Sequence, residues 1–220
     1  MIYRTIRNDM LRNKAITLTT MIFVAAASML VSLAAILVVN LTGAIDALMN
    51  EAKTTHFMQM HSGDLDSARL TAFAVQQNDI EAYQVLEFLN IDGASIIFEE
   101  GSLSGSIQDN GISTQSSKFD YLLDLDGNVI QASDGEIYVP IPYMQAGLAK
   151  IGDNVQVVGK KFSVAGFTRD SQMNSLLSTS KRFLVSDNDY ATIRDSGSVE
   201  YLIEFRLTDP GALGAFETAY

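Results

Sequence analysis

A long uncharged stretch near the N-terminus, residues 15–45, constrains this chain more than any other feature. It lies between basic and acidic residues, namely Arg4, Arg7, Arg12 and Lys14 before it and Asp46 and Glu51 after it. As a helix at about 1.5 Å per residue, residues 16–41 would extend roughly 39 Å, and a hydrocarbon layer is about 30 Å thick. A single strand would leave its backbone amides unpaired in lipid. We therefore predict a transmembrane helix over residues 16–41.

The charges that flank this helix predict its orientation. The first fourteen residues carry four basic groups and a single acid, Asp9, and basic segments stay in the cytoplasm. We expect residues 1–15 to be a cytoplasmic basic segment and the bulk of the chain to be extracytoplasmic, at the inner or plasma membrane of the cell. The alternative is a cleaved signal peptide, because residues 25–27 are small. Its apolar core would be only about 7 to 15 residues long, roughly half of this one.

The balance of charge and the lack of cysteine exclude several functions. The chain has a net charge of -11, and the basic N-terminal arm leaves -14 on residues 15–220. Nucleic acids and anionic membrane surfaces both need clustered Lys and Arg, so we expect neither as a partner of the acidic part. The chain has no cysteine, which excludes disulfides, thiolate catalysis and thiolate metal sites.

Helical periodicity continues beyond the predicted membrane span. Apolar residues recur at helical spacing at Leu41, Ala44, Ile45, Leu48 and Ala52, and polar residues take the other face. The pattern predicts a stalk helix over residues 42–54. A short juxtamembrane linker is the alternative.

Residues 55–220 mix strand and helix patterns. A strand over 55–60, a helix over 64–77 and a strand over 80–91 would form a strand-helix-strand unit. Residues 101–117 are rich in Ser, Gly, Asn and Gln, which predicts a flexible connection. Residues 119–132 predict a hairpin that turns at Asp126-Gly127-Asn128.

The remaining elements follow the same rules of alternation and capping. We expect strands over 137–141, 182–185 and 199–207, helices over 143–150 and 188–194, and a hairpin of 154–158 with 161–167 around Gly159-Lys160. Asp209 and Pro210 are a typical helix start, and helix-compatible residues follow to Tyr220. Because a domain rarely ends inside its last helix, we expect the chain to be an N-terminal fragment of a longer protein.

Candidate chemical motifs are few. His56 and His61 are five positions apart, so on a strand they would face opposite sides and could not share a metal ion. The run Asp124–Asn128 has Val129 and Gly135 where a calcium loop needs glycine and glutamate, so a hairpin turn explains it better. Residues 101–105 match the pattern of a nucleophile elbow without the required strand and helix. We therefore predict no catalytic, cofactor-binding or metal-binding residue, and a protein that is not an enzyme.

Several segments together resemble a known family. They are the basic segment 6–14, the single apolar helix with its stalk, Ala149–Val155 followed by Phe162–Phe167, and Phe183–Asp187 with Tyr190 and Ile193. In this combination the chain resembles the permease subunit of MacB/FtsX-type ABC transporters. In the hairpin, Gly152-Asp153 can form a turn in which the aspartate bonds its own backbone two residues on, and Gly166 permits a bulge or a close backbone approach.

The resemblance implies an α+β fold, with a MacB-like periplasmic core domain inserted between the first and second of four membrane helices. It implies two subdomains, a porter-like half of residues 55–100 and 198–220 and an inserted lobe of residues 101–197. It also implies a homodimer or paired permease and a cytoplasmic ABC ATPase as the partner that hydrolyses ATP. The chain would then serve export or mechanotransmission.

A sensor is the alternative from a different class. One membrane helix, a stalk and an α/β outer domain also suit the input half of a signalling receptor that binds a small ligand, and the hairpin at Asp126-Gly127-Asn128 would fit such a domain. An anchored enzyme or adhesin is a third interpretation. Further hydrophobic segments downstream would favour the permease, and a single span followed by a signalling helix would favour the sensor.

Overall fold

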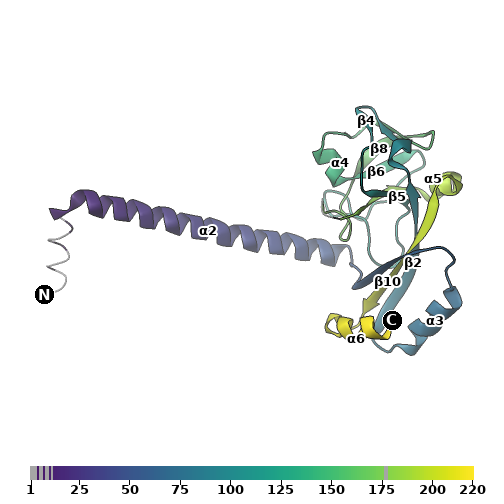
Figure 1. The fold of residues 1–220 in the computed structure, drawn as a ribbon, viewed down its shortest axis with the longest axis horizontal. Coiled ribbons are helices and arrows are strands. Elements are labelled where there is room, and N and C mark those ends of the chain that lie inside the picture. The colour runs from purple at the N-terminus through teal and green to yellow at the C-terminus, as the bar shows by residue number, and fades with distance from the viewer. Residues whose placement is uncertain (1–3, 5–6, 8–9, 11, 176–177) are drawn as a thin grey trace. The chain divides into compact units, whose positions relative to one another are not determined.

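The computed structural model describes Arg4, Arg7, Met10 and residues 12–175 and 178–220. The chain divides into two compact units, Met1–Ala47 and Leu48–Tyr220. An apolar helix dominates the first unit and a mixed α/β domain forms the second, so the fold class is α+β as predicted (Figure 1). The basic segment at the N-terminus lies largely outside the described residues.

Helix α2 runs without interruption over Lys14–Glu51. It is the one helix in the described part of the chain that is long and apolar enough to cross a membrane, judged by length and composition. None of its residues is buried. The hydroxyls of Thr19, Thr20, Ser28, Ser32 and Thr42 donate to carbonyls four residues earlier. These hydroxyls therefore find partners within the helix, as an apolar solvent requires.

Helix α2 continues beyond residue 41, through Gly43, as far as Glu51. The assignment of residues 42–54 as a stalk stays a prediction. The helix ends where Lys53 adopts a left-handed conformation with φ 47. The amide of Thr54 then donates to the Met49 carbonyl at 2.9 Å, which closes the last turn.

The second unit is built on one sheet of ten strands, in the order β1-β10-β2-β5-β9-β6-β8-β7-β3-β4. The strands are β1 (Phe57–Ser62), β2 (Ile80–Ile91), β3 (Ile96–Phe98), β4 (Gly101–Ser102), β5 (Asp109–Ser113), β6 (Glu136–Pro140), β7 (Asn154–Val157), β8 (Lys160–Thr168), β9 (Ser180–Val185) and β10 (Ser198–Leu207). Most pairs are antiparallel, but β5 runs parallel to β9 and β6 runs parallel to β8.

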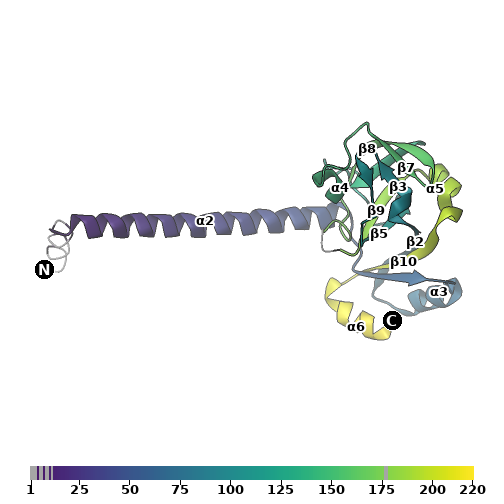
Figure 2. The same cartoon turned by 45° about the horizontal axis from the view of Figure 1, so that its top comes forward.

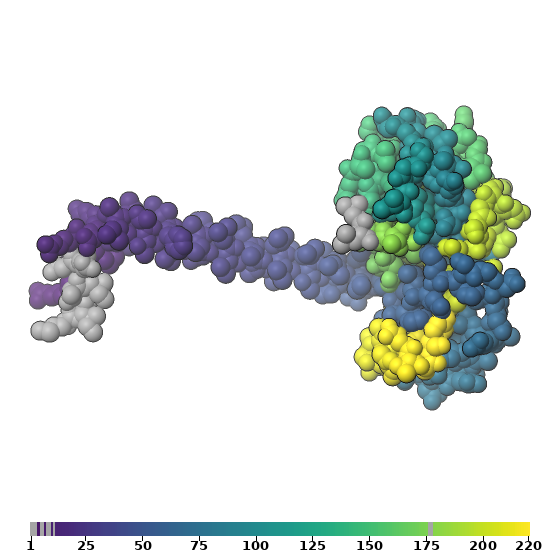
Figure 3. Space-filling model, viewed as in Figure 1, coloured from purple at the N-terminus to yellow at the C-terminus, as the bar shows by residue number. Residues whose placement is uncertain are grey.

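Two helices cover the β1-β10-β2 end of the sheet. These are α3 (Ser67–Gln76), capped by Asp66, and α6 (Leu213–Ala219), which follows the short turn Pro210–Ala212. Phe205 and Phe216 are buried in the cluster that joins them. Figure 3 shows the C-terminal residues in yellow against the early part of the domain in blue, although the two are far apart in the sequence.

The other end of the sheet holds the larger core. Its buried residues come from seven strands and from helices α4 (Ile141–Gln145) and α5 (Asp187–Ile193). In Figure 2, β3, β7 and β8 lie at the end of the domain away from α3 and α6. Several predicted elements are confirmed here, namely the hairpin of β7 with β8 and the step from β9 into α5.

Of the two predictions made for residues in the β7–β8 hairpin region, the one for Gly166 is confirmed and the one for Asp153 is not. The pairing of β6 with β8 shifts register between Ile137 and Tyr138, and a Cβ on Gly166 would lie 2.9 Å from the Tyr138 ring. The predicted bulge and close approach at Gly166 are therefore confirmed. The Asp153 carboxylate, by contrast, accepts from the Lys150 amide three residues earlier, and not from a residue two positions on.

The prediction of a flexible connection over residues 101–117 is wrong. Residues 109–113 form β5, which pairs with β2 and β9 inside the sheet. The glycine that suggested flexibility has a packing role, because a Cβ on Gly111 would lie 2.1 Å from the Phe88 ring. Small residues in this strand are what the close approach of an aromatic ring requires.

The hairpin predicted within residues 119–132 is present in a short form: Leu123 makes an antiparallel bridge to Val129, the Ile130 amide donates to the Leu122 carbonyl at 3.1 Å, and a turn lies at Gly127. Another prediction needs correction. The helix predicted over 143–150 is α4, which begins earlier, at Ile141 beside Pro142, and ends at Gln145. Gly147 has φ 75 soon after, which prevents continuation. The boundaries of the two proposed subdomains stay a prediction.

Candidate functional site

The most unusual feature of the domain is a fully buried arginine in the middle of the sheet. Arg182 belongs to β9, all six residues of which are buried, and its side chain is only 2% exposed. Its Nε and Nη2 donate to the Asp170 carboxylate at 2.8 and 3.1 Å, and Nη2 also donates to Asp120 Oδ2 at 2.8 Å. A buried guanidinium without such partners would be strongly destabilising.

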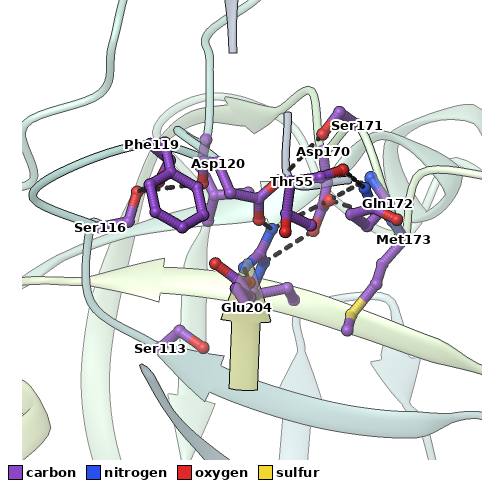
Figure 4. A network of polar contacts seen from close by, with 12 residues as sticks. Thr55, Ser113, Ser116, Phe119, Asp120, Asp170, Ser171, Gln172, Met173 and Glu204 are labelled. Carbon is purple, nitrogen blue, oxygen red and sulfur yellow. Dashed lines mark hydrogen bonds and ion pairs between the residues drawn. The ribbon is translucent and has the colours of Figure 1, made fainter. Parts of the chain in front are cut away.

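A third carboxylate completes the cluster. Glu204 on β10 is fully buried, and its Oε1 lies 3.8 Å from Arg182 Nη1. Gln84 on β2 donates from one Nε2 to both Glu204 Oε2, at 2.7 Å, and the Phe119 carbonyl, at 2.9 Å. Figure 4 shows Asp120, Asp170 and Glu204 converging on one point from two loops and a strand. We call Arg182, Asp120, Asp170, Glu204 and Gln84 the ionic junction.

The loops that supply the two aspartates are themselves fixed. Asp170 Oδ1 accepts from the amides of Gln172 and Met173 at 2.8 and 3.0 Å, which folds the loop after β8 around it. Asp120 has φ 53, a conformation that aspartate tolerates better than most residues. Ser171 donates to Asp120 Oδ1 at 3.1 Å and so joins the two loops.

The ionic junction also holds the segment that follows helix α2. The amide of Asp120 donates to the Lys53 carbonyl at 3.0 Å, and the amide of Tyr121 donates to the Ala52 carbonyl at 2.8 Å. Thr55 donates to the carbonyl of Phe205, the neighbour of Glu204, at 2.9 Å. One residue, Asp120, therefore bonds the end of the helix through its backbone and Arg182 through its carboxylate.

The electrostatics of the junction follow from one cation among three carboxyl groups. Burial by itself would lower the pKa of Arg182, but Asp170, Asp120 and Glu204 outweigh it and raise that pKa. Burial and then the Asp120 charge raise the pKa of Glu204 from 4.5 to about 8, against the opposing effects of Arg182 and the Gln84 hydrogen bond. A protonated Glu204 beside the charged Arg182 is the arrangement that this favours at neutral pH.

The histidines and the Asp124 turn that were candidates in the sequence do not belong to the ionic junction, and each has its own hydrogen-bond partners. His56 Nδ1 accepts from the Leu207 amide at 2.9 Å, and His61 Nε2 lies 3.1 Å from the Asp64 carbonyl. Asp124 accepts from the amides of Asp126 and Asn128, which satisfies it within its own turn. Within the described ranges, no group of three or more His, Cys, Asp and Glu residues could hold a metal ion.

The ionic junction was not predicted from the sequence, although one signal for it was present. Arg182 interrupts the apolar end of β9, and Glu204 interrupts the apolar run of β10. A charge inside an otherwise buried strand indicates a buried partner of opposite charge. That signal predicts that partners exist but not which ones, because Asp120 and Asp170 come from loops 62 and 12 positions away from Arg182.

Comparisons with known proteins find similar folds only among solved structures. No family model matches the sequence, and no curated protein matches it. The periplasmic region of MacB from Actinobacillus actinomycetemcomitans is similar at 13% identity and a TM-score of 0.42, over 78% of this chain and 83% of that one. A Bacillus anthracis protein assigned as a lipoprotein is similar at 15% identity and a TM-score of 0.41, over 69% and 83% of the two chains. At these identities and TM-scores, neither structure assigns a function to this chain.

Proposed function

We propose that the chain is a permease-type transmembrane subunit of an ABC transporter, which couples ATP hydrolysis by a partner ATPase to an extracytoplasmic domain. The observation that carries the proposal is the direct bonding of the end of helix α2 to the buried ionic junction. The resemblance of segments 6–14, 149–155 and 162–167 to MacB/FtsX-type permeases supports it. The N-terminus would be cytoplasmic and residues 55–220 would lie outside the cell membrane.

The covalent and polar path from the helix to the sheet is short. Helix α2 is continuous to Glu51, and the carbonyls of the next two residues accept hydrogen bonds from amides of the loop that carries Asp120. Asp120 bonds Arg182 on β9, and Arg182 in turn contacts Glu204 on β10. A displacement of the helix end would therefore act on two strands of the sheet without passing through a flexible linker, as coupling between distant sites requires a contiguous network.

The proposal assigns the chemistry of ATP hydrolysis to a partner. The ionic junction is buried, so its charges would hold chain segments in place and would not act on a substrate. A cytoplasmic ABC ATPase and a second permease chain, identical or paired, are the proposed partners. Export and mechanotransmission would both use the same movement of α2.

Purification from native membranes tests the proposal. The tagged protein is extracted in mild detergent, and we expect an ABC ATPase to copurify, with a turnover that changes when this subunit is added. The absence of native cysteine allows a single label at exposed Ser104, as Ser104→Cys, to report on the outer domain. We expect its fluorescence to change when ATP is added to the complex.

Two variants at one position separate coupling from assembly. Gly43→Pro would kink α2 between the membrane span and the domain, so the ATPase should still bind while the ATP-dependent signal at residue 104 is lost. Gly43→Ala is the control, because no atom lies within 4 Å of the added Cβ and alanine favours the helix. A stable complex with a sensor kinase or adaptor, and none with an ATPase, would instead support the receptor alternative.

A further inference from the structure

A second feature of the domain is a cavity that the proposed function does not use. It has a volume of about 340 Å³ and is lined by the last turn of α2 and the segment after it, by Arg206 of β10, and by the chain at the start of α6. Three of its lining residues are Lys53, His56 and Arg206, and none is Asp or Glu. The chain as a whole has 26 acidic residues against 15 Lys and Arg. The ionisable residues that line this cavity are all basic, so its charge is opposite to that of the whole chain.

The hydrogen bonds of His56 fix its role. Its Nδ1 accepts from the Leu207 amide, so a neutral ring carries its proton on Nε2 and offers a donor there. Burial and then the charge of Arg206 lower the pKa of His56, which favours the neutral ring at pH 7. His56 therefore supplies a directed N–H group and not a second full charge.

The two cations are placed differently. Arg206 is anchored, since Nη1 donates to the Thr54 carbonyl at 2.7 Å and Nε lies 3.3 Å from Glu81 Oε2. Lys53 Nζ lies over the Tyr121 ring, 5.7 Å from its centroid. It pairs with no carboxylate in the part of the chain that the structure describes. Its left-handed backbone, an unusual conformation for lysine, turns the chain at the wall of this cavity.

Thr54 adds an independent observation. It lines the same cavity, is only 6% exposed, and its Oγ1 has no hydrogen-bond partner among the described residues. A buried hydroxyl without a partner is costly unless a water or ligand satisfies it. The wall thus combines an unpaired ammonium, an anchored guanidinium, an imidazole N–H and an unsatisfied hydroxyl.

We propose that this cavity binds a small oxyanion of the phosphate class. Its donors have no competing carboxylate on the cavity wall, and several N–H and O–H groups around one anion are the usual means of holding phosphate oxygens. The anion could be supplied by a lipid headgroup or by free phosphate, because Met49, which also lines the cavity, is only eight positions beyond Leu41. The inference does not depend on the transporter assignment.

The test uses the full chain in two kinds of nanodisc. In phosphatidylcholine nanodiscs, inorganic phosphate is titrated by calorimetry. In nanodiscs that also contain phosphatidylglycerol, native mass spectrometry counts the lipids that stay bound. Saturable binding of phosphate in the millimolar range would identify the free anion, and preferential retention of phosphatidylglycerol would identify the headgroup.

Matched variants decide whether the binding belongs to this cavity. Lys53→Glu reverses an exposed charge at the cavity and should weaken binding at least tenfold, while Lys161→Glu makes the same change on an exposed position of β8 and should leave it within twofold. Near-UV circular dichroism of the tyrosines confirms that both variants fold. The proposal is overturned if neither phosphate nor phosphatidylglycerol binds, if Lys53→Glu has no effect, or if both variants weaken binding equally.

Discussion

Glu204 and Phe205 are neighbours on β10, but their side chains enter opposite environments. Phe205 lies among five other aromatic rings whose centroids are 5.0–6.1 Å from its own, between the sheet and helices α3 and α6. Glu204 points to the other face, into the ionic junction with Arg182. Because successive side chains of a strand alternate, one strand divides an apolar cluster from a charged one.

The two faces of β10 contribute differently to the domain. The aromatic face is non-directional, since its stabilisation depends on buried area and tolerates small changes of shape. The ionic junction is directional, because Nε and Nη2 of Arg182 donate to carboxylate oxygens of Asp170 and Asp120 at defined positions. The charged face therefore fixes where the Asp120 loop, and with it the end of α2, attaches to the sheet.

The largest effect should come from removing the single cation. Arg182→Met leaves three buried carboxyl groups without their partner, and we expect a loss of about 3 to 5 kcal/mol in the free energy of unfolding. Urea unfolding of the full chain in detergent micelles, followed by near-UV circular dichroism, measures it. Arg69→Met, at an exposed position of α3, is the control and should change stability by less than about 0.5 kcal/mol. If Arg182→Met also changed the free energy of unfolding by less than about 0.5 kcal/mol, the ionic junction would not contribute to the stability of the fold.

The second largest effect should be a dependence on pH that only the charged face has. The pKa of Glu204 is raised in the folded state, so the folded protein binds a proton that the unfolded chain releases above about 4.5. The stabilisation that this bound proton gives the folded state is complete below about pH 4.5. It falls as the pH rises towards 8, by about 2 kcal/mol between pH 6 and pH 8.

Glu204→Gln should remove this dependence, because glutamine resembles the protonated side chain. It should match the wild type at pH 6 and exceed it at pH 9 in urea unfolding. Glu217→Gln, on the exposed side of α6, serves as the control. An unchanged slope of stability against pH in Glu204→Gln would show that this carboxyl is not the proton-binding group.

A change on the aromatic face should be smaller and independent of pH. Phe205→Leu keeps most of the buried volume but removes the ring contacts, and we expect a loss of about 1.5 kcal/mol, with the same value at pH 6 and pH 9. A loss that varied with pH would mean that the two faces of β10 are coupled and do not act as separate clusters.

The smallest effect should come from the edge of the junction. Ser171→Ala removes a single hydrogen bond to Asp120 at 3.1 Å, for an expected loss of about 1 kcal/mol. In a double-mutant cycle with Asp120→Asn, a coupling energy near zero would show that Ser171 does not hold the Asp120 loop.

Elements with strong local patterns were predicted well. The apolar helix, strand β2 and the hairpin of β7 with β8 follow from length, alternation and turn residues within their own segments. The prediction failed for β5, where Asp109–Ser113 has the composition of a loop. Its strand conformation comes from pairing with β2 and β9, and Gly111 leaves the space that the Phe88 ring occupies.

By itself, the sequence determined the long apolar helix and the local identity of most strands, because hydrophobic periodicity and turn chemistry act over a few residues. The tertiary structure alone decided the order of the strands and the partners of Arg182. Those depend on contacts between segments far apart in the chain, such as Asp120 with Arg182, 62 positions apart, and Thr55 with Phe205, 150 positions apart. Over such separations loop closure and packing, and not local preference, select the pairing.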